Sequence, residues 1–231
     1  MKKQLTLSAL ALCFVVGAAQ FTFAQDLILD DFTTGHYSGP AVRSGTQTST
    51  QFGGMIGGAR DNGLFICNPK IKGDCASRNP YVQPSAYGFF PAKGGQPTSM
   101  VVTGGYFTGP PRFEMDYGFH TPMDVNFSAY QKIRVSFSGL TQTLNFNIQV
   151  FTDPSDHALG GCNVPALAGP FSVELPLSKF SIQGPNFDFG HIRLIQVIHQ
   201  DGSAVGGMAF GVTSIVLTNT TAGGVVIACP S

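Results

Sequence analysis

The sequence LNFNIQV, near the middle of the chain, places three amide side chains at alternate positions. Alternate residues of a β-strand point to the same face, so Asn145, Asn147 and Gln149 are predicted to lie in one row. An amide offers both a donor and an acceptor, which suits the vicinal hydroxyl groups of a sugar. With Arg134 and Glu174 beside it, this row is a candidate glycan-binding face. The alternative, an ordinary solvated face, stays open.

Aromatic side chains are the second feature expected of a sugar site, because rings stack on the apolar face of a sugar. The chain has no Trp, 6 Tyr and 20 Phe, and most Phe are expected in a core. Residues 68–96 form a segment rich in Pro, Gly and Tyr, which we expect to be a long ordered loop. Tyr81 and Tyr87 in this loop are the stacking candidates, although a simple packed loop explains them equally well.

Motifs for several other chemistries are absent. The chain contains no Gly-x-Ser-x-Gly nucleophile motif, no phosphate-binding loop and no dinucleotide fingerprint. Its 5 histidines show no close metal-ligand spacing, so a copper or zinc site would have to be assembled by folding.

The elements that position these residues are predicted to be β-strands. Polar and apolar residues alternate in Lys132–Phe137 and in Phe171–Leu175, where Ser172 and Glu174 are expected to point outward. His191–Gln200 is apolar on both faces, which is typical of a central strand or of one with a bulge. Further strands are expected at residues 27–32, 51–56, 99–107, 112–117 and 208–218.

Turn signals separate these runs, and no segment sustains a helical apolar period. The pattern predicts an all-β, single-domain antiparallel β-sandwich, most simply a jelly roll. We expect this domain to span residues 25–219, followed by a C-terminal tail at residues 220–231.

The first 24 residues have the three regions of a secretory signal peptide. Lys2 and Lys3 precede an apolar run, and the segment ends in the small residue Ala24. No later segment approaches the roughly 20 apolar residues of a membrane span. We therefore expect a secreted protein, periplasmic or extracellular, with no membrane span.

Charge also limits the choice of partner. The chain has 13 basic and 13 acidic residues and only 11% charged residues, and two of the lysines belong to the predicted signal. A slightly acidic mature chain argues against nucleic acid as a partner, because polyanion binders gather a basic face.

Four cysteines follow the signal peptide, an even number in a chain predicted to reach an oxidising compartment. Of the three possible pairings we favour Cys67 with Cys75, closing a local loop, and Cys162 with Cys229, fastening the tail to the domain. A zinc site is the alternative, but no Cys-x-x-Cys pair is present.

Four segments together resemble a group of exported bacterial β-sandwich proteins. They are Leu29–Phe32 with its Asp-Asp-Phe, the Gly-Gly-x-Arg turn at Gly57–Arg60, Phe187–Ile198 and Phe210–Ile215. The overall shape of this group is similar to galactose-binding-like and carbohydrate-binding modules. The resemblance covers the outer thirds of the mature chain and implies a jelly roll, but supplies no activity.

The resemblance also implies a place for a structural calcium ion, near the meeting point of the first and last strands. Asp30 and Asp31 lie in that area, and carboxylate oxygens suit calcium. The alternative is that the two acids merely end the first strand, with one of them capping the turn into Thr33-Thr34-Gly35. No other cofactor is predicted.

A second resemblance concerns catalysis. RFEMDY, which contains Arg112 and Tyr117, and QVIHQ, which contains His199, are similar to strands of jelly-roll polysaccharide lyases. It implies that Arg112 neutralises a uronate while His199 or Tyr117 removes its α-proton. The chain departs from these lyases because no Lys/Tyr strand completes the site.

The function predicted from the sequence is noncatalytic binding of a glycan or another cell-envelope component. The alternatives left open are a polysaccharide lyase of jelly-roll type and a structural or assembly protein of the cell surface. Ligand identity and oligomeric state do not follow from the residues.

Overall fold

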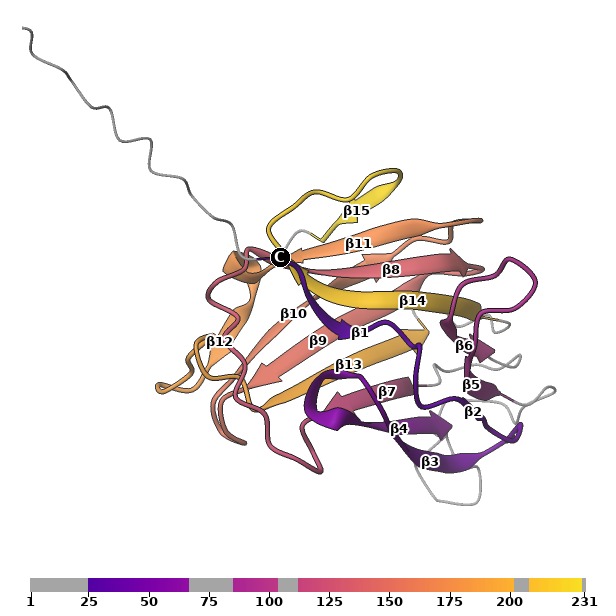
Figure 1. Cartoon of the computed structure of the whole chain (residues 1–231), viewed down its shortest axis with the longest axis horizontal. Coiled ribbons are helices and arrows are strands. Elements are labelled where there is room, and N and C mark those ends of the chain that lie inside the picture. Colours follow the sequence, from indigo (N-terminus) through magenta and orange to yellow (C-terminus); the bar gives the residue numbers. More distant parts are fainter. Residues whose placement is uncertain (1–24, 67–84, 104–111, 202–207, 230–231) are drawn as a thin grey trace, which may run out of the picture.

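The computed structural model describes residues 25–66, 85–103, 112–201 and 208–229, and these form two β-sheets that face each other (Figure 1). Sheet I contains β1 (Leu27–Asp30), β2 (Tyr37–Ser38), β5 (Ala86–Phe90), β6 (Ser99–Thr103), β8 (Lys132–Leu140), β11 (Phe171–Pro176), β14 (Ala209–Thr218) and β15 (Val226–Ala228). Sheet II contains β3 (Gly45–Phe52), β4 (Ala59–Ile66), β7 (Arg112–Tyr117), β9 (Leu144–Phe151), β10 (His157–Val164), β12 (Ser181–Gln183) and β13 (Leu194–Asp201).

The strand order shows how the chain crosses between the sheets. Sheet I runs β15-β11-β8-β14-β6-β5-β2, with β1 beside β14, and sheet II runs β12-β10-β9-β13-β7-β4-β3. Among the described strands every pairing is antiparallel except β11 with β15. The repeated crossing from one sheet to the other confirms the predicted all-β sandwich of jelly-roll type.

Helical structure in the described ranges is limited to two 3₁₀ turns, η1 (Ile56–Gly58) and η2 (Leu177–Lys179). Neither of these turns has the length and apolar character needed to cross a membrane.

The core lies between the sheets and follows the period-two pattern of the sequence. In β9 the side chains of Phe146, Ile148 and Val150 are fully buried, and the amides between them are half-buried. Phe137 of β8 reaches across from sheet I, with its ring 6.0 Å from that of Phe146. Burial of such apolar side chains is the main favourable contribution to the stability of the fold.

Three expectations about the strands are wrong. Residues 68–96, expected to be a long loop, include β5 (Ala86–Phe90), which pairs with β6 in sheet I. Ser172 and Glu174 in β11 are buried rather than exposed, because β15 pairs alongside their strand and the Ala222 N–H of the segment before β15 donates to the Glu174 carboxylate. The strand expected at residues 51–56 instead covers Gly45–Phe52. The sequence of this strand, GTQTSTQF, lacks apolar alternation because its inward glutamines bind other polar groups: Gln47 Nε2 donates to the Tyr37 hydroxyl at 3.1 Å.

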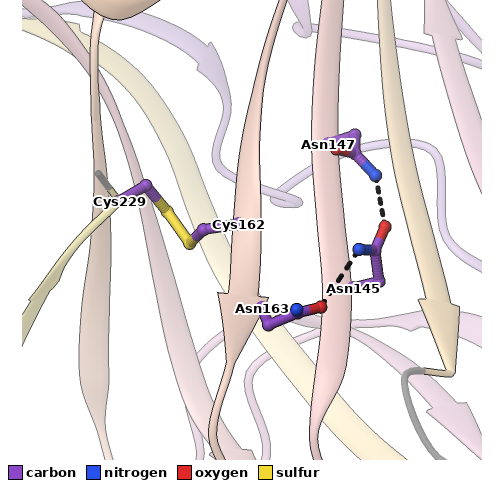
Figure 2. The surroundings of a disulfide bond; sticks show 5 residues. All are labelled: Asn145, Asn147, Cys162, Asn163 and Cys229. Atoms are coloured by element: carbon purple, nitrogen blue, oxygen red, sulfur yellow. Dashed lines mark hydrogen bonds between the residues drawn. A yellow bond between two sulfur atoms is a disulfide. The ribbon is translucent and has the colours of Figure 1, made fainter. Parts of the chain in front are cut away.

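A disulfide joins Cys162 of β10 to Cys229 just after β15, with a Cα–Cα distance of 5.4 Å. It ties the C-terminal segment at the edge of sheet I to sheet II (Figure 2). This confirms the pairing predicted for these two cysteines. Cys67 and Cys75 lie outside the described residues.

A buried ion pair links the first strand to sheet II. Arg60 of β4 has no exposed side-chain surface and pairs with Asp30 of β1, and its guanidinium lies 3.7 Å from the centre of the Phe89 ring. The Asp30 carboxylate also accepts hydrogen bonds from the Tyr117 hydroxyl at 2.9 Å and from the Phe32 N–H at 2.8 Å. Strands from both sheets therefore converge on one carboxylate.

Removing this carboxylate is expected to destabilise the protein strongly. In Asp30→Asn the Arg60 guanidinium stays buried without a counter-charge, and the free energy of unfolding should fall by about 3–5 kcal/mol. The neighbouring Asp31→Asn is the matched control, because the Asp31 carboxylate accepts hydrogen bonds from the nearby Thr33, and its replacement should cost about 1 kcal/mol. Urea unfolding measures both, and equal losses would contradict this role of Asp30.

Candidate functional site

The three predicted amides do lie in one row, on the outer face of β9. Asn147 Nδ2 donates to the side chain of Asn145, and Asn145 Nδ2 donates to Asn163 Oδ1 at 3.1 Å (Figure 2). Gly161 of β10 faces Asn147, and a Cβ atom there would meet the Asn147 Oδ1 atom at 2.3 Å. The glycine therefore leaves the space in which the Asn147 amide lies.

Arg134 and Glu174 do not join this row, because they lie in sheet I. Glu174 accepts bonds from Lys132 Nζ at 2.6 Å and from Arg134 Nε at 3.0 Å, and from the Ala222 N–H at 3.1 Å. Burial alone would raise the pKa of Glu174, but the hydrogen bonds from Lys132, Ala222 and Arg134 outweigh it and lower the pKa. The pair thus holds the segment that leads to β15 against sheet I.

The two tyrosines predicted to stack on a ligand are not on a described surface. Tyr81 lies outside the described residues. Tyr87 belongs to the core at 3% exposure, and its hydroxyl lies 2.6 Å from Ser49 Oγ. Burial raises the pKa of Tyr87 to about 12. A ring in this position supports the packing of β5 on sheet II and has no face open to a sugar.

Asp30 and Asp31, the candidate calcium ligands, have separate protein partners. Asp30 is engaged by Arg60 and Tyr117, while Asp31 Oδ1 accepts the Thr33 hydroxyl at 2.6 Å, which lowers the pKa of Asp31. Within the described ranges no group of three or more His, Cys, Asp or Glu side chains is arranged to hold a metal ion. These hydrogen bonds fit the interpretation that the two acids end the first strand.

The three residues of the lyase hypothesis lie on opposite faces of sheet II. Arg112 is half-exposed on the outer face, whereas Tyr117 and His199 are fully buried on the inner face. Burial, and then the charge of Asp30, raise the pKa of Tyr117 well above its ordinary value. The backbone of the sheet separates the proposed neutraliser from both proposed bases, so these residues do not form one site.

The structure instead forms a polar pocket on the outer face of sheet II, separated from the amide row of β9 by the single strand β13. It has a volume of about 290 Å³. We call it the carboxylate pocket, and its outward-facing lining comes from β3, β4, β7 and the turn after β7: Thr48, Thr50, Asp61, Gly63, Phe65, Glu114, Asp116 and Phe119.

Strand register connects this pocket to the amide row. Gln149 of β9 pairs with Gln196 of β13, which pairs with Asp116 of β7. Asp116 then pairs with Asp61 of β4, and Asp61 with Thr50 of β3. Five polar side chains thus form one lateral row, which spans about 19 Å at the usual strand spacing of about 4.8 Å.

The carboxylates in the pocket have different electrostatic surroundings. Glu114 is paired with Arg112 and accepts a hydrogen bond from the Gln196 amide. Burial raises the pKa of Asp116 to about 7, and the negative charge of Glu114 adds to this effect. Asp61 accepts the Thr50 hydroxyl at 2.6 Å and lies 3.0 Å from His120 Nε2. One buried oxygen of Asp116 and one of Asp61 have no protein partner.

Two phenylalanine rings line the pocket. Phe65 is 39% exposed and Phe119 is 71% exposed. The Phe65 ring folds over Gly63, where an added Cβ atom would meet it at 2.5 Å, so the absence of a side chain at Gly63 sets the depth of the floor. The pocket therefore combines acceptors for hydroxyl groups with apolar surfaces.

Sequence reasoning overlooked Asp61, Glu114 and Asp116. A usable signal was present in RFEMDY, because Arg112, Glu114 and Asp116 occupy alternate positions and must share one face of a strand. No comparable signal marks Asp61, since its neighbours Arg60 and Asn62 are polar residues that point inward.

The fold is an all-β sandwich with a polar pocket on the outer face of one sheet. No protein-family model matches the chain, and no curated protein sequence is similar to it. Among solved structures, it is similar to the family 11 carbohydrate-binding module of the cellulosomal cellulase Lic26A-Cel5E of Clostridium thermocellum, with a TM-score of 0.45 and 16% identity over 85% of this chain and 95% of the module.

A second structure of the family 11 module from Clostridium thermocellum, in complex with a β-1,3-1,4-mixed-linked tetrasaccharide, has a TM-score of 0.44 and 16% identity over 84% of this chain and 96% of the module. The likeness is one of β-sandwich arrangement.

The buried histidine generates a prediction about acid stability. His199 is surrounded by the rings of Phe113, Phe137, Phe146 and Phe210, and burial lowers its pKa from 6.5 to about 3. The unfolded chain therefore takes up this proton at higher pH than the folded protein does. The contribution of neutral His199 to the free energy of unfolding is complete above pH 6.5. It decreases as the pH falls toward 3, by at most about 1.4 kcal/mol per pH unit.

His199→Leu should flatten this loss, as measured by urea unfolding between pH 7 and pH 4. The raised pKa of Asp116 has the opposite effect, because it makes the protein more stable as the pH falls from about 7 to the ordinary pKa of 3.8. Both proteins contain Asp116, so this effect cancels in the comparison. The exposed His36→Gln is the control and should keep the slope of the unmodified protein. Identical pH profiles for His199→Leu and the unmodified protein would contradict the buried neutral state.

Proposed function

We propose that this protein is a noncatalytic glycan-binding module whose ligand lies in the carboxylate pocket and along the polar row. The observation that carries the proposal is the lateral row from Thr50 to Gln149. It presents hydroxyl, carboxyl and amide groups beside the rings of Phe65 and Phe119. This mixture matches a sugar, which has hydroxyl groups at its edge and an apolar face.

The charge of the pocket favours a neutral glycan over an acidic one. Three acidic side chains, Asp61, Glu114 and Asp116, line it, and the Arg112 guanidinium is already paired with Glu114. A uronate would be repelled by these carboxylates, whereas a neutral hydroxyl can donate to them. A pocket built to bind alginate or pectin would need an unpaired cation here.

Export is part of the proposal. The Cys162–Cys229 disulfide is typical of proteins that fold in an oxidising compartment, where neutral envelope or extracellular glycans are available. Residues 1–24, the predicted signal peptide, lie outside the described residues.

The test is calorimetric titration of the purified protein with neutral oligosaccharides of glucan, xylan and mannan, with oligogalacturonate as the acidic comparison. Binding of a neutral glycan supports the proposal. Binding restricted to the acidic one, or release of unsaturated uronate from it, would overturn the proposed ligand class and favour lyase chemistry.

Asp116→Asn should weaken glycan binding in a pH-dependent manner. At pH 8.5 the carboxyl is ionised, because its pKa is about 7, and loss of a charge-assisted hydrogen bond should reduce affinity about tenfold to a hundredfold. At pH 5.5 the carboxyl is already neutral, so the same substitution should have less effect. Calorimetry at the two pH values measures the difference.

Asp124→Asn is the matched control, because Asp124 is an exposed acid paired with His191 outside the pocket lining. It should bind the glycan as the unmodified protein does. An equal loss of affinity in both variants would show that the pocket does not hold the ligand.

A further inference from the structure

A second cavity lies beside the carboxylate pocket on the same face of sheet II. It has a volume of about 420 Å³, and its lining includes Gly118, Phe119, Pro122, Phe151 and Leu194. We call it the apolar cavity. Phe119 lines both this cavity and the carboxylate pocket, so one ring separates the two spaces.

Strand geometry independently places the two cavities next to each other. Leu194 and Gln196 are two residues apart on β13, and both face outward and are half-buried. Leu194 pairs with Phe151, as Gln196 pairs with Gln149. The apolar pair Leu194–Phe151 is therefore the next lateral row after the polar row, about 7 Å along the strands.

The polar side chains around the apolar cavity already have hydrogen-bond partners in the protein. Thr152 Oγ1 donates to the Asp188 carbonyl at 3.2 Å and accepts the Asp188 N–H at 3.0 Å. Asp153 Oδ1 accepts the Ser155 N–H at 2.8 Å and its hydroxyl at 2.7 Å. Arg193, the remaining charged lining residue, is exposed. The floor of the cavity thus offers apolar surface and few free acceptors.

The apolar lining determines which chemical group, attached to the sugar, can occupy the apolar cavity. A second sugar ring buried in the apolar cavity would leave several hydroxyl groups without partners, which is unfavourable. An alkyl, acyl or aryl group would instead remove the surfaces of Leu194, Phe151 and Phe119 from water, which is favourable.

We propose that the ligand is an amphiphilic glycan, whose neutral sugar lies in the carboxylate pocket and whose apolar substituent lies in the apolar cavity across Phe119. This inference rests on the proposed function and adds to it a ligand class, an alkylated or acylated glycoside. Phe119 contacts both parts, with its exposed ring between the polar and apolar rows.

The test compares methyl, butyl and octyl β-glucosides and β-galactosides, each below its micelle-forming concentration, by NMR titration and calorimetry of the full mature chain. Affinity should rise about fourfold for each methylene group that becomes buried, so that the octyl compound binds more than tenfold tighter than the methyl compound. Leu194→Asn should abolish this rise and leave the affinity for the methyl glycoside unchanged. Phe151→Asn is an independent second variant with the same expected result.

The outcomes separate the two proposals. If methyl and octyl glycosides bind equally and Asp116→Asn weakens both, the glycan site stands and the amphiphilic ligand is wrong. If only the octyl compound binds, and Asp116→Asn does not affect it, the cavity takes apolar groups without a sugar and the proposed function fails. If octyl glycosides do not bind at all, the amphiphilic ligand is overturned, because the apolar cavity should hold the alkyl chain whichever sugar carries it.

Discussion

The buried pair of Asp30 and Arg60 is the interaction on which the arrangement of the two sheets depends. Asp30 comes from β1 in sheet I, while Arg60 and the hydrogen-bonded Tyr117 come from adjacent strands of sheet II. A charged guanidinium without exposed surface is tolerated because a carboxylate, backbone carbonyls and aromatic rings surround it. The pair requires that β1, β4 and β7 take one relative position.

The same network also fixes side chains on the outer face of sheet II, because successive residues of a strand point to opposite faces. Asp61 follows Arg60 in β4, and Asp116 precedes Tyr117 in β7, so the inward residues of the buried network alternate with the outward residues of the carboxylate pocket. Asp61 and Asp116 also face each other in register. A network that fixes the inner face thereby holds two acids side by side at the surface, where burial, then the charge of Glu114 and, to a smaller extent, that of Asp61 raise the pKa of Asp116.

Two polar groups outside this region, His199 and Glu174, serve packing instead. His199 is a neutral ring within a cluster of phenylalanines. Glu174 accepts hydrogen bonds from the side chains of Lys132 and Arg134 and from the backbone near the C-terminus. The disulfide fastens the same terminal segment to sheet II. Sheet I and the tail thus form a support, while the described polar row and both cavities beside it lie on sheet II.

The sequence alone determined the strands in which polar and apolar residues alternate strictly, such as β8 and β9, because this alternation is a local property of the chain. It also predicted the sandwich class and favoured the pairing of Cys162 with Cys229, which the structure contains. It misjudged the polar strand β3 and the burial of Glu174, since both depend on partners distant in the chain. The carboxylate pocket was decided by tertiary structure, because Thr50, Asp61 and Asp116 meet only through the register of three strands, and register is set by non-local pairing and by the buried residues behind it.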